Sequence, residues 1–200
     1  MNTINFTFNI LITGNKGVGK TSIINKYTNK DFNNYSNKNI KLLNNNEKFN
    51  DFIVWLDNYC IKLNIIDHYD NNNILLHYSI ADFIIIVCDI TNIESYNIDE
   101  YINNKKNYCD KRVEYIIINN KVDKINIFNE KIEYTTKYQN ISAKTNYGIN
   151  ILFKSIIRKL IDKYNKITKL NSIDFTKIEH IIDYNHKKSN FFMKLFKICC

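Results

Sequence analysis

The stretch GNKGVGKT, residues 14–21, decides how this chain folds, and it closely follows the apolar run ILI of residues 10–12. It fits the pattern G-x-x-x-x-G-K-[ST] of a phosphate-binding P-loop, in which glycines let successive backbone N–H groups point at one anion. In such a loop Lys20 supplies a positive charge for the β- and γ-phosphates, and the Thr21 hydroxyl is an oxygen ligand for Mg²⁺. A glycine-rich turn that carries a lysine by chance is the alternative. The strand-like run before the stretch and the helix-like run after it (Thr21–Tyr27) favour the P-loop, because this motif lies between a strand and a helix. The N-terminal dipole of that helix also favours an anion.

The composition is typical of a soluble globular domain with a tail. Of the 200 residues, 44% are hydrophobic and 24% are charged. The longest apolar run, Phe83–Cys88, is too short to span a bilayer, and we expect neither a signal peptide nor myristoylation at the N-terminus. Five cysteines without zinc-binding spacing are typical of reduced residues in a cytosolic protein.

The net charge of +8 is spread unevenly along the chain. Half of it belongs to four lysines that follow the last acidic residue, Asp183. The charge of the preceding part is mild for its size, so we expect no nucleic-acid partner. Asn, Lys, Ile, Tyr and Phe are abundant, which is typical of A/T-rich codons. The four lysines are Lys187, Lys188, Lys194 and Lys197.

Strand-like and helix-like runs alternate along the chain, which predicts an α/β fold with a mostly parallel sheet and helices on both faces. The turn Asp57-Asn58-Tyr59 predicts a hairpin whose outer strand is antiparallel at an edge. Periodic apolar residues in Gly148–Asn165 indicate the best amphipathic helix. The expected strands are Phe6–Thr13, Phe49–Leu56, Cys60–Ile66, Asp82–Asp89, Val113–Asn119 and Tyr138–Ser142. The other expected helices are Asn73–Ile80, Ile93–Cys109 and Lys124–Lys131.

Two further motifs follow predicted strands: NKVD at residues 120–123 and SAK at residues 142–144. Ligands bind at the carboxyl ends of strands in open α/β sheets. The Asp123 carboxylate can accept from the N1–H and the 2-amino group of guanine, whereas adenine would leave it unpaired. Three motifs in this order, each after a strand, predict a guanine-nucleotide site.

The neighbours of Asp123 have expected roles in the same base pocket. Asn120 can hold the loop or the purine edge, and the Ala143 N–H can meet the guanine carbonyl. The aliphatic stems of Lys121 and Lys144 can flank the ring faces.

With these motifs in place, the chain resembles the Rab family within the Ras superfamily of small GTPases, from about Phe6 to Lys166. Ile61–Asp67 is similar to the strand that ends in the D-x-x-G aspartate, and His77–Thr91 to the segment from switch II into the next strand. The resemblance implies a P-loop small-GTPase fold, with a six-stranded, mostly parallel sheet, one antiparallel edge strand and five helices. We expect a G domain at residues 1–166 and a flexible basic tail at residues 167–200.

The resemblance also implies a site for GTP or GDP with Mg²⁺. Phe32 would stack on guanine, Ser22 would contact the α-phosphate, and Asp67 would join Thr21 at the metal. The expected nucleotide-binding residues are Gly14, Gly17, Val18, Gly19, Lys20, Thr21, Ser22, Phe32, Asn120, Lys121, Asp123, Ser142, Ala143 and Lys144.

Both switch segments depart from the family pattern. No Thr occurs between Thr28 and Thr91, where the family has a metal-binding threonine. Residues 67–71 read DHYDN instead of D-x-x-G-Q. Asn71 therefore stands at the position of the water-orienting glutamine, and as a shorter side chain it is expected to be a weak catalytic residue. The carboxylate of Asp70 would repel the γ-phosphate. Drift under nucleotide bias that leaves an ordinary slow switch is the alternative.

The final Cys199-Cys200 resembles the dual geranylgeranylation signal of Rabs, with a basic and apolar segment at 187–197 suited to an anionic leaflet. A basic tail that ends in two cysteines by chance is the alternative. By resemblance we expect a monomer on the cytoplasmic face of endomembranes, with a cytosolic pool. Its partners would be effectors, exchange factors and prenylation-escort proteins.

Three functions follow from these observations. The first is a Rab-like GTPase in vesicle trafficking with slow or impaired hydrolysis, and the second is a membrane-anchored pseudo-GTPase adaptor that holds nucleotide without switching. The third, a basic RNA-binding protein, is the weakest.

Overall fold

The structure is a computed structural model, and it describes residues 3–28, 49–67, 74–125 and 138–171. The chain divides into two compact units, Met1–Leu160 and Ile161–Cys200. Every strand of the described residues lies in the first unit, and residues of α5 (Ile149–Asn171) belong to both units. The expected boundary between a G domain and a tail near residue 166 stays a prediction.

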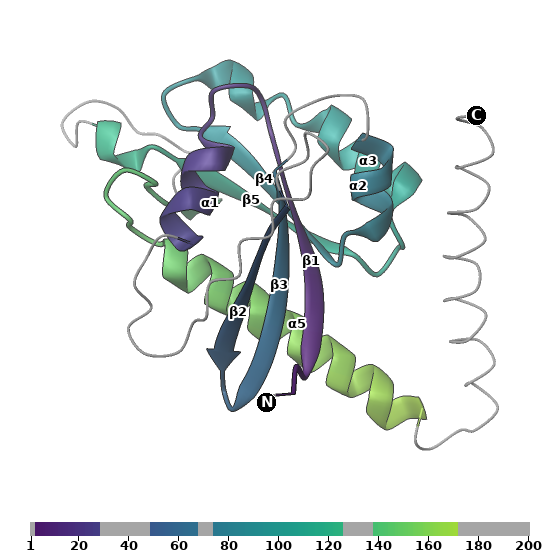
Figure 1. Cartoon of the computed structure of the whole chain (residues 1–200). Coiled ribbons are helices and arrows are strands. Elements are labelled where there is room, and N and C mark those ends of the chain that lie inside the picture. The colour runs from purple at the N-terminus through teal and green to yellow at the C-terminus, as the bar shows by residue number, and fades with distance from the viewer. Residues whose placement is uncertain (1–2, 29–48, 68–73, 126–137, 172–200) are drawn as a thin grey trace. The chain divides into compact units, whose positions relative to one another are not determined.

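A six-stranded sheet in the order β2-β3-β1-β4-β5-β6 forms the centre of the first unit (Figure 1). All neighbouring strands are parallel except the pair β2 and β3, so the antiparallel edge strand is confirmed. The strands are β1 (Phe6–Thr13), β2 (Phe49–Leu56), β3 (Tyr59–Asp67), β4 (Phe83–Asp89), β5 (Glu114–Asn120) and β6 (Gln139–Asn140).

The hairpin between β2 and β3 closes on a two-residue turn. Asp57 and Asn58 both have positive φ, 49° and 70°, and Leu56 pairs with Tyr59 across the turn. Positive φ at both central residues defines the tight hairpin turns that match strand twist, and Asn and Asp tolerate this conformation better than most residues. The predicted turn is confirmed, one residue shorter than expected.

Helices pack on both faces of the sheet, and they are α1 (Lys20–Thr28), α2 (Ile74–Ile80), α3 (Asp99–Tyr108) and α5 (Ile149–Asn171). Figure 1 shows α2 and α3 next to each other on one side, where Tyr78 and Ala81 pack with Leu11 and Ile84. Tyr27 of α1 stacks on Phe153 of α5, with ring centroids 3.8 Å apart. Successive residues of a strand point to opposite faces of the sheet, so an apolar strand can pack against the helices on both faces. Every residue of β4 is buried accordingly.

The segment expected to be one helix over Ile93–Cys109 is instead two pieces, the 3₁₀ helix η2 (Ile93–Tyr96) and α3. The Asn92 side chain caps η2 by accepting from the Glu94 N–H. The Ser95 hydroxyl turns back to donate to the Asn92 carbonyl at 2.6 Å and accepts from the Asp89 N–H. These local side-chain bonds compete with a continuous helix, which is why propensity alone missed the break.

The remaining expected helix, Lys124–Lys131, lies outside the described residues beyond Ile125. Its first residue, Lys124, ends the short 3₁₀ helix η3 (Val122–Lys124). No helix in the described ranges is both long enough and apolar enough to cross a bilayer.

Candidate nucleotide-binding site

The loop from Gly14 to Gly19 connects β1 to α1 at the carboxyl edge of the parallel strands. Gly14 has φ +139°, and a Cβ there would collide with the backbone carbonyl of Val87. Gly17 has φ +85° and open space where a Cβ would stand. The first glycine therefore lets the loop lie against β4, and the second keeps the loop's outer side clear for a ligand.

Lys20 folds back over this loop. Its ammonium donates to the carbonyl of Gly14 at 2.7 Å and to the carbonyl of Asn15 at 3.0 Å. Because an ammonium has three donors, one is left for an anion. Burial lowers the pKa of Lys20, and the negative charge of Asp67 opposes that shift. The side chain is thus held in place before any phosphate arrives.

Backbone donors accompany the lysine. No described residue accepts a hydrogen bond from the N–H of Gly17, Gly19 or Lys20. These groups lie in the loop and at the first residue of α1, where N–H groups lack intrahelical partners and favour an anion. The loop therefore fits a phosphate chain.

Thr21 and Asp67 place two side-chain oxygens that could coordinate a metal beside the loop. The Thr21 hydroxyl donates to Asp67 Oδ2 at 2.5 Å. Asp67 ends β3, and its Oδ1 is buried with no hydrogen-bond partner among the described residues. A hydroxyl and a carboxylate suit Mg²⁺, so the residues present fit this ion. The described ranges contain no cluster of three or more His, Cys, Asp or Glu side chains, so the metal would need further oxygens from nucleotide and water.

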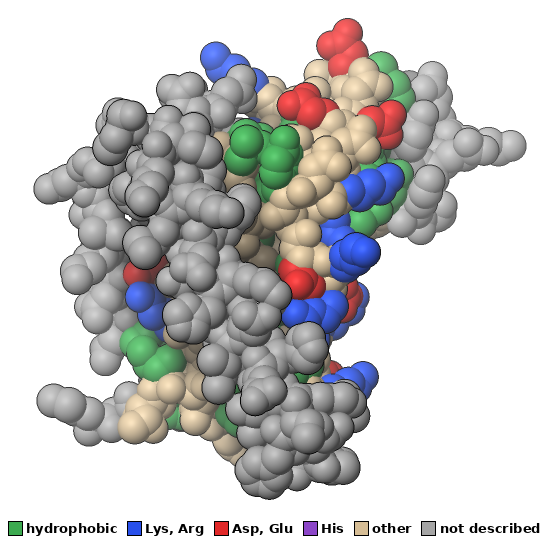
Figure 2. Space-filling model, turned by 90° about the vertical axis from the view of Figure 1, so that its right-hand side faces the viewer, with side chains coloured by type: hydrophobic (Ala, Val, Ile, Leu, Met, Phe, Trp, Pro, Cys, Tyr) green, Lys and Arg blue, Asp and Glu red, His purple; other side chains and the backbone are tan. Residues whose placement is uncertain are grey.

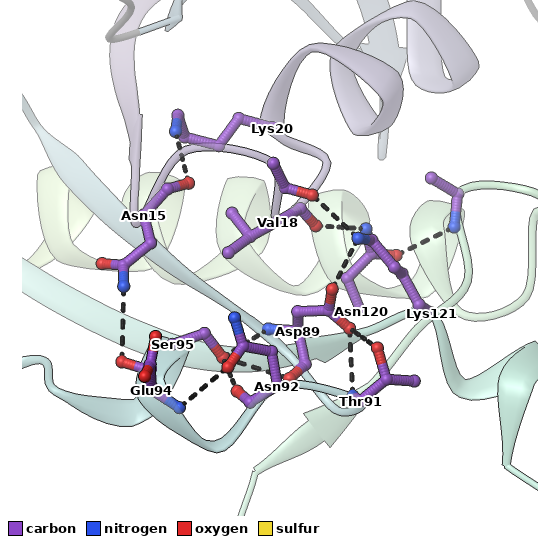
Figure 3. A network of polar contacts seen from close by, with 12 residues as sticks. Asn15, Val18, Lys20, Asp89, Thr91, Asn92, Glu94, Ser95, Asn120 and Lys121 are labelled. Atoms are coloured by element: carbon purple, nitrogen blue, oxygen red, sulfur yellow. Dashed lines mark hydrogen bonds and ion pairs between the residues drawn. The ribbon is translucent and has the colours of Figure 1, made fainter.

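Asn120, at the end of β5, joins the three sequence motifs (Figure 3). It is 1% exposed, and its Nδ2 donates to the Val18 carbonyl at 2.9 Å. Its Oδ1 accepts from the Ala143 N–H at 3.0 Å. The P-loop, the NKVD segment and the SAK segment are thereby held together through one side chain. The Ala143 N–H is occupied here, so its expected contact with a guanine carbonyl stays a prediction.

Lys121 bridges the same region from a left-handed backbone conformation, φ 66°. Its ammonium donates to the Gly17 carbonyl at 2.8 Å and forms an ion pair with Asp89 at 2.5 Å. Thr91 also donates to Asp89, from its N–H and its hydroxyl. Burial alone would raise the pKa of Asp89, but the hydrogen bonds from Lys121 and Thr91 outweigh it and lower the pKa. The charged carboxylate orients the lysine across the loop.

Asp123 presents an exposed carboxylate next to this network. The Ser142 hydroxyl donates to its Oδ1 at 2.6 Å, and this bond lowers the pKa of Asp123. Ser142 in turn accepts from the Thr145 N–H at 3.1 Å, which fixes the direction of the hydroxyl. Asp123 is therefore held ionised, as an acceptor-only group aimed by its neighbours.

The structure thus brings most of the expected nucleotide-binding residues to one edge of the sheet. Ser22 and Lys144 lie there with exposed side chains, and no hydrogen bond joins either side chain to a described residue. Phe32, Asn71, Cys199 and Cys200 lie outside the described residues. Asp89 was missed from the sequence, although a carboxylate that ends a buried strand just before Thr91 is a usable signal.

The chain was also compared with known proteins. The family model "Ras family" matches residues 9–162. The chain is similar to Ras-related protein Rab-8B of Homo sapiens, with 29% identity over 204 residues that cover 95% of this chain and 96% of the relative. It is similar to Ras-related protein Rab-8 of Diplobatis ommata, with 30% identity over 184 residues that cover 86% and 85% of the two chains.

Proposed function

Because the chain belongs to the Ras family of small GTPases and is Rab-like, we propose that it binds GTP and GDP with Mg²⁺ and recruits effector proteins to endomembranes in vesicle trafficking. Family membership implies the guanine nucleotide. The observation that carries the proposal is the placement of Asn120, whose two hydrogen bonds unite the phosphate loop with both base-pocket segments.

The chain's own residues have separable tasks in this proposal. Lys20 and the free N–H groups of the loop bind the phosphates, while the Asp123 carboxylate reads the two adjacent donors of guanine. Thr21 and Asp67 would hold Mg²⁺, which when bound neutralises charge on the β- and γ-phosphates. Lys121, held by Asp89, orients the base segment over the loop.

The proposal includes slow or impaired GTP hydrolysis. The sequence lacks the switch threonine, glycine and glutamine, so we expect intrinsic hydrolysis at or below about 10⁻⁴ s⁻¹. A single-turnover assay that shows an ordinary Rab-like rate would contradict this expectation. A nucleotide-bound adaptor that does not switch is the second candidate, and the DHYDN sequence of residues 67–71 favours it. Hydrogen exchange of residues 32–52 compared between GDP and a GTP analogue separates the two, since only a switch changes its protection.

Membrane attachment in this proposal would come from Cys199 and Cys200 through prenylation, assisted by the lysines of 187–197. The face shown in Figure 2 carries both basic and acidic side chains of the described residues. In the sequence, half of the net charge of +8 comes from the four lysines that follow Asp183.

The test of guanine recognition is the substitution Asp123→Asn. Asparagine replaces an acceptor oxygen by a donor NH₂, so the preference should move from guanine toward xanthine, whose C2 carbonyl accepts. Competition of GDP and XDP for the purified chain measures this shift, and nucleotide that co-purifies identifies the natural ligand. Asp162→Asn removes an exposed carboxylate of α5 and is the matched control. Retained guanine selectivity in Asp123→Asn would overturn the base-pocket assignment.

A further inference from the structure

A hydrogen-bonded path runs from α3 to the phosphate-binding lysine. The Tyr101 hydroxyl donates to Asn15 Oδ1 at 2.7 Å, and Asn15 Nδ2 donates to the Glu94 carbonyl at 3.3 Å. The backbone carbonyl of the same Asn15 accepts from Lys20 Nζ at 3.0 Å. Figure 3 shows Asn15 between Glu94 on one side and Lys20 on the other. Asn15 thus links the loop to both η2 and α3.

The tyrosine end of this path is anchored. Tyr101 is partly buried and packs against the cluster that contains Leu11, Tyr78 and Ile84. A ring packed on one side with a hydroxyl bonded on the other has little freedom to turn. Asn15 lies 86 residues away in the sequence, at a position where the P-loop pattern accepts any residue. The P-loop pattern by itself therefore does not require this contact.

Lys20 depends on where the Asn15 carbonyl stands. Two of its three donors are used on loop carbonyls, and the direction of the remaining donor follows from those two bonds. If Asn15 leaves its place, Lys20 loses one of the two acceptors that aim it. If only a fraction of the molecules hold Lys20 in the arrangement that binds phosphate, the apparent affinity for the ligand falls to that fraction of its full value.

We propose that Tyr101 is a positioning residue for Lys20, which acts through Asn15 and sets the affinity of the site for the β-phosphate of a nucleoside diphosphate or triphosphate. The inference rests on the proposed guanine-nucleotide function. It assigns α3 a part in phosphate binding without any contact between α3 and the ligand.

The test is Tyr101→Phe, which deletes the hydroxyl and keeps the packed ring. GDP should dissociate faster and bind more weakly by up to about five-fold, the factor that a net hydrogen bond of about 1 kcal/mol equals. Binding of GMP should change by less than about two-fold, because GMP offers Lys20 no β-phosphate to bind. The probes are a fluorescent guanine nucleotide displaced by GDP or by excess GMP. Tyr108→Phe is the matched control, because its hydroxyl is on the same helix and bonds to no described residue.

A double-mutant cycle identifies the route of the effect. Asn15→Ala should weaken GDP binding at least as much as Tyr101→Phe, because it also removes the bond to the Glu94 carbonyl. The double variant should be no weaker than Asn15→Ala, because the Tyr101 hydroxyl then has no Asn15 side chain to bond. Additive losses, equal losses for GDP and GMP, or no loss in Tyr101→Phe would each overturn the inference. If the unmodified chain binds no GDP, the proposed function fails instead. A melting curve of each variant shows whether a loss of binding reflects a general loss of stability.

Discussion

Replacing Asn120 by Ala tests whether one side chain joins the three motifs. Asn120 is almost fully buried, and it makes two hydrogen bonds, to the Val18 carbonyl at 2.9 Å and from the Ala143 N–H at 3.0 Å. Alanine removes both bonds and leaves a buried carbonyl and a partly buried N–H without partners. At about 1 kcal/mol net for each bond, plus the penalty for unpaired groups, the free energy of unfolding should fall by about 2–4 kcal/mol.

Urea unfolding followed by far-ultraviolet circular dichroism measures this change, with and without excess GDP. For a slope of about 2 kcal/mol per molar urea, a loss of about 3 kcal/mol lowers the midpoint by roughly 1.5 M. The stabilisation by GDP should also shrink, because ligand bound only to the folded state stabilises it according to its affinity. Both readings come from the same set of curves.

Asn103→Ala supplies the comparison for this measurement. Asn103 is exposed on α3, so the same chemical change there should be neutral or stabilise by a few tenths of a kcal/mol through helix propensity. If Asn120→Ala costs less than about 1 kcal/mol, or leaves GDP stabilisation intact, the reasoning that Asn120 ties the loops together is refuted.

Two further predictions concern the glycines of the P-loop and the carboxylate of Asp89. Gly14→Ala places a Cβ against the backbone carbonyl of Val87 and should abolish GDP binding or folding. Gly17→Ala meets open space, so it should lower the free energy of unfolding only by the strain of positive φ, about 1–2 kcal/mol. Thermal unfolding of the two variants measures the difference. Asp89 has a folded-state pKa below its ordinary value of 3.8, so its contribution to stability is present above that value and is lost as the pH falls through the folded pKa. The difference in free energy of unfolding between the unmodified chain and Asp89→Asn should therefore be larger at about pH 6 than at about pH 3, and a constant difference would contradict the ion pair with Lys121.

The sequence by itself determined the features that depend on neighbours along the chain. The P-loop is a local pattern of glycines, lysine and threonine, and the strand β4 is a continuous apolar run of the kind typical of a buried central strand. The positive-φ turn at Asp57 and Asn58 likewise follows from residue types that tolerate it. In these elements the local conformational preference of the residues agrees with the global fold, so sequence patterns are enough to predict them.

Only the tertiary structure decided which side chains meet across the site. Asn120 reaches Val18 over a separation of 102 residues, and Tyr101 reaches Asn15 over 86. No local period encodes such pairs, because strand order and helix placement bring them together and burial then makes each missing partner costly. The division of residues 93–109 into η2 and α3 depends instead on bonds between near neighbours, since Ser95 bonds to Asp89 and Asn92. The motif identified the groups that we expect to bind phosphate, and the fold determines what holds those groups in place.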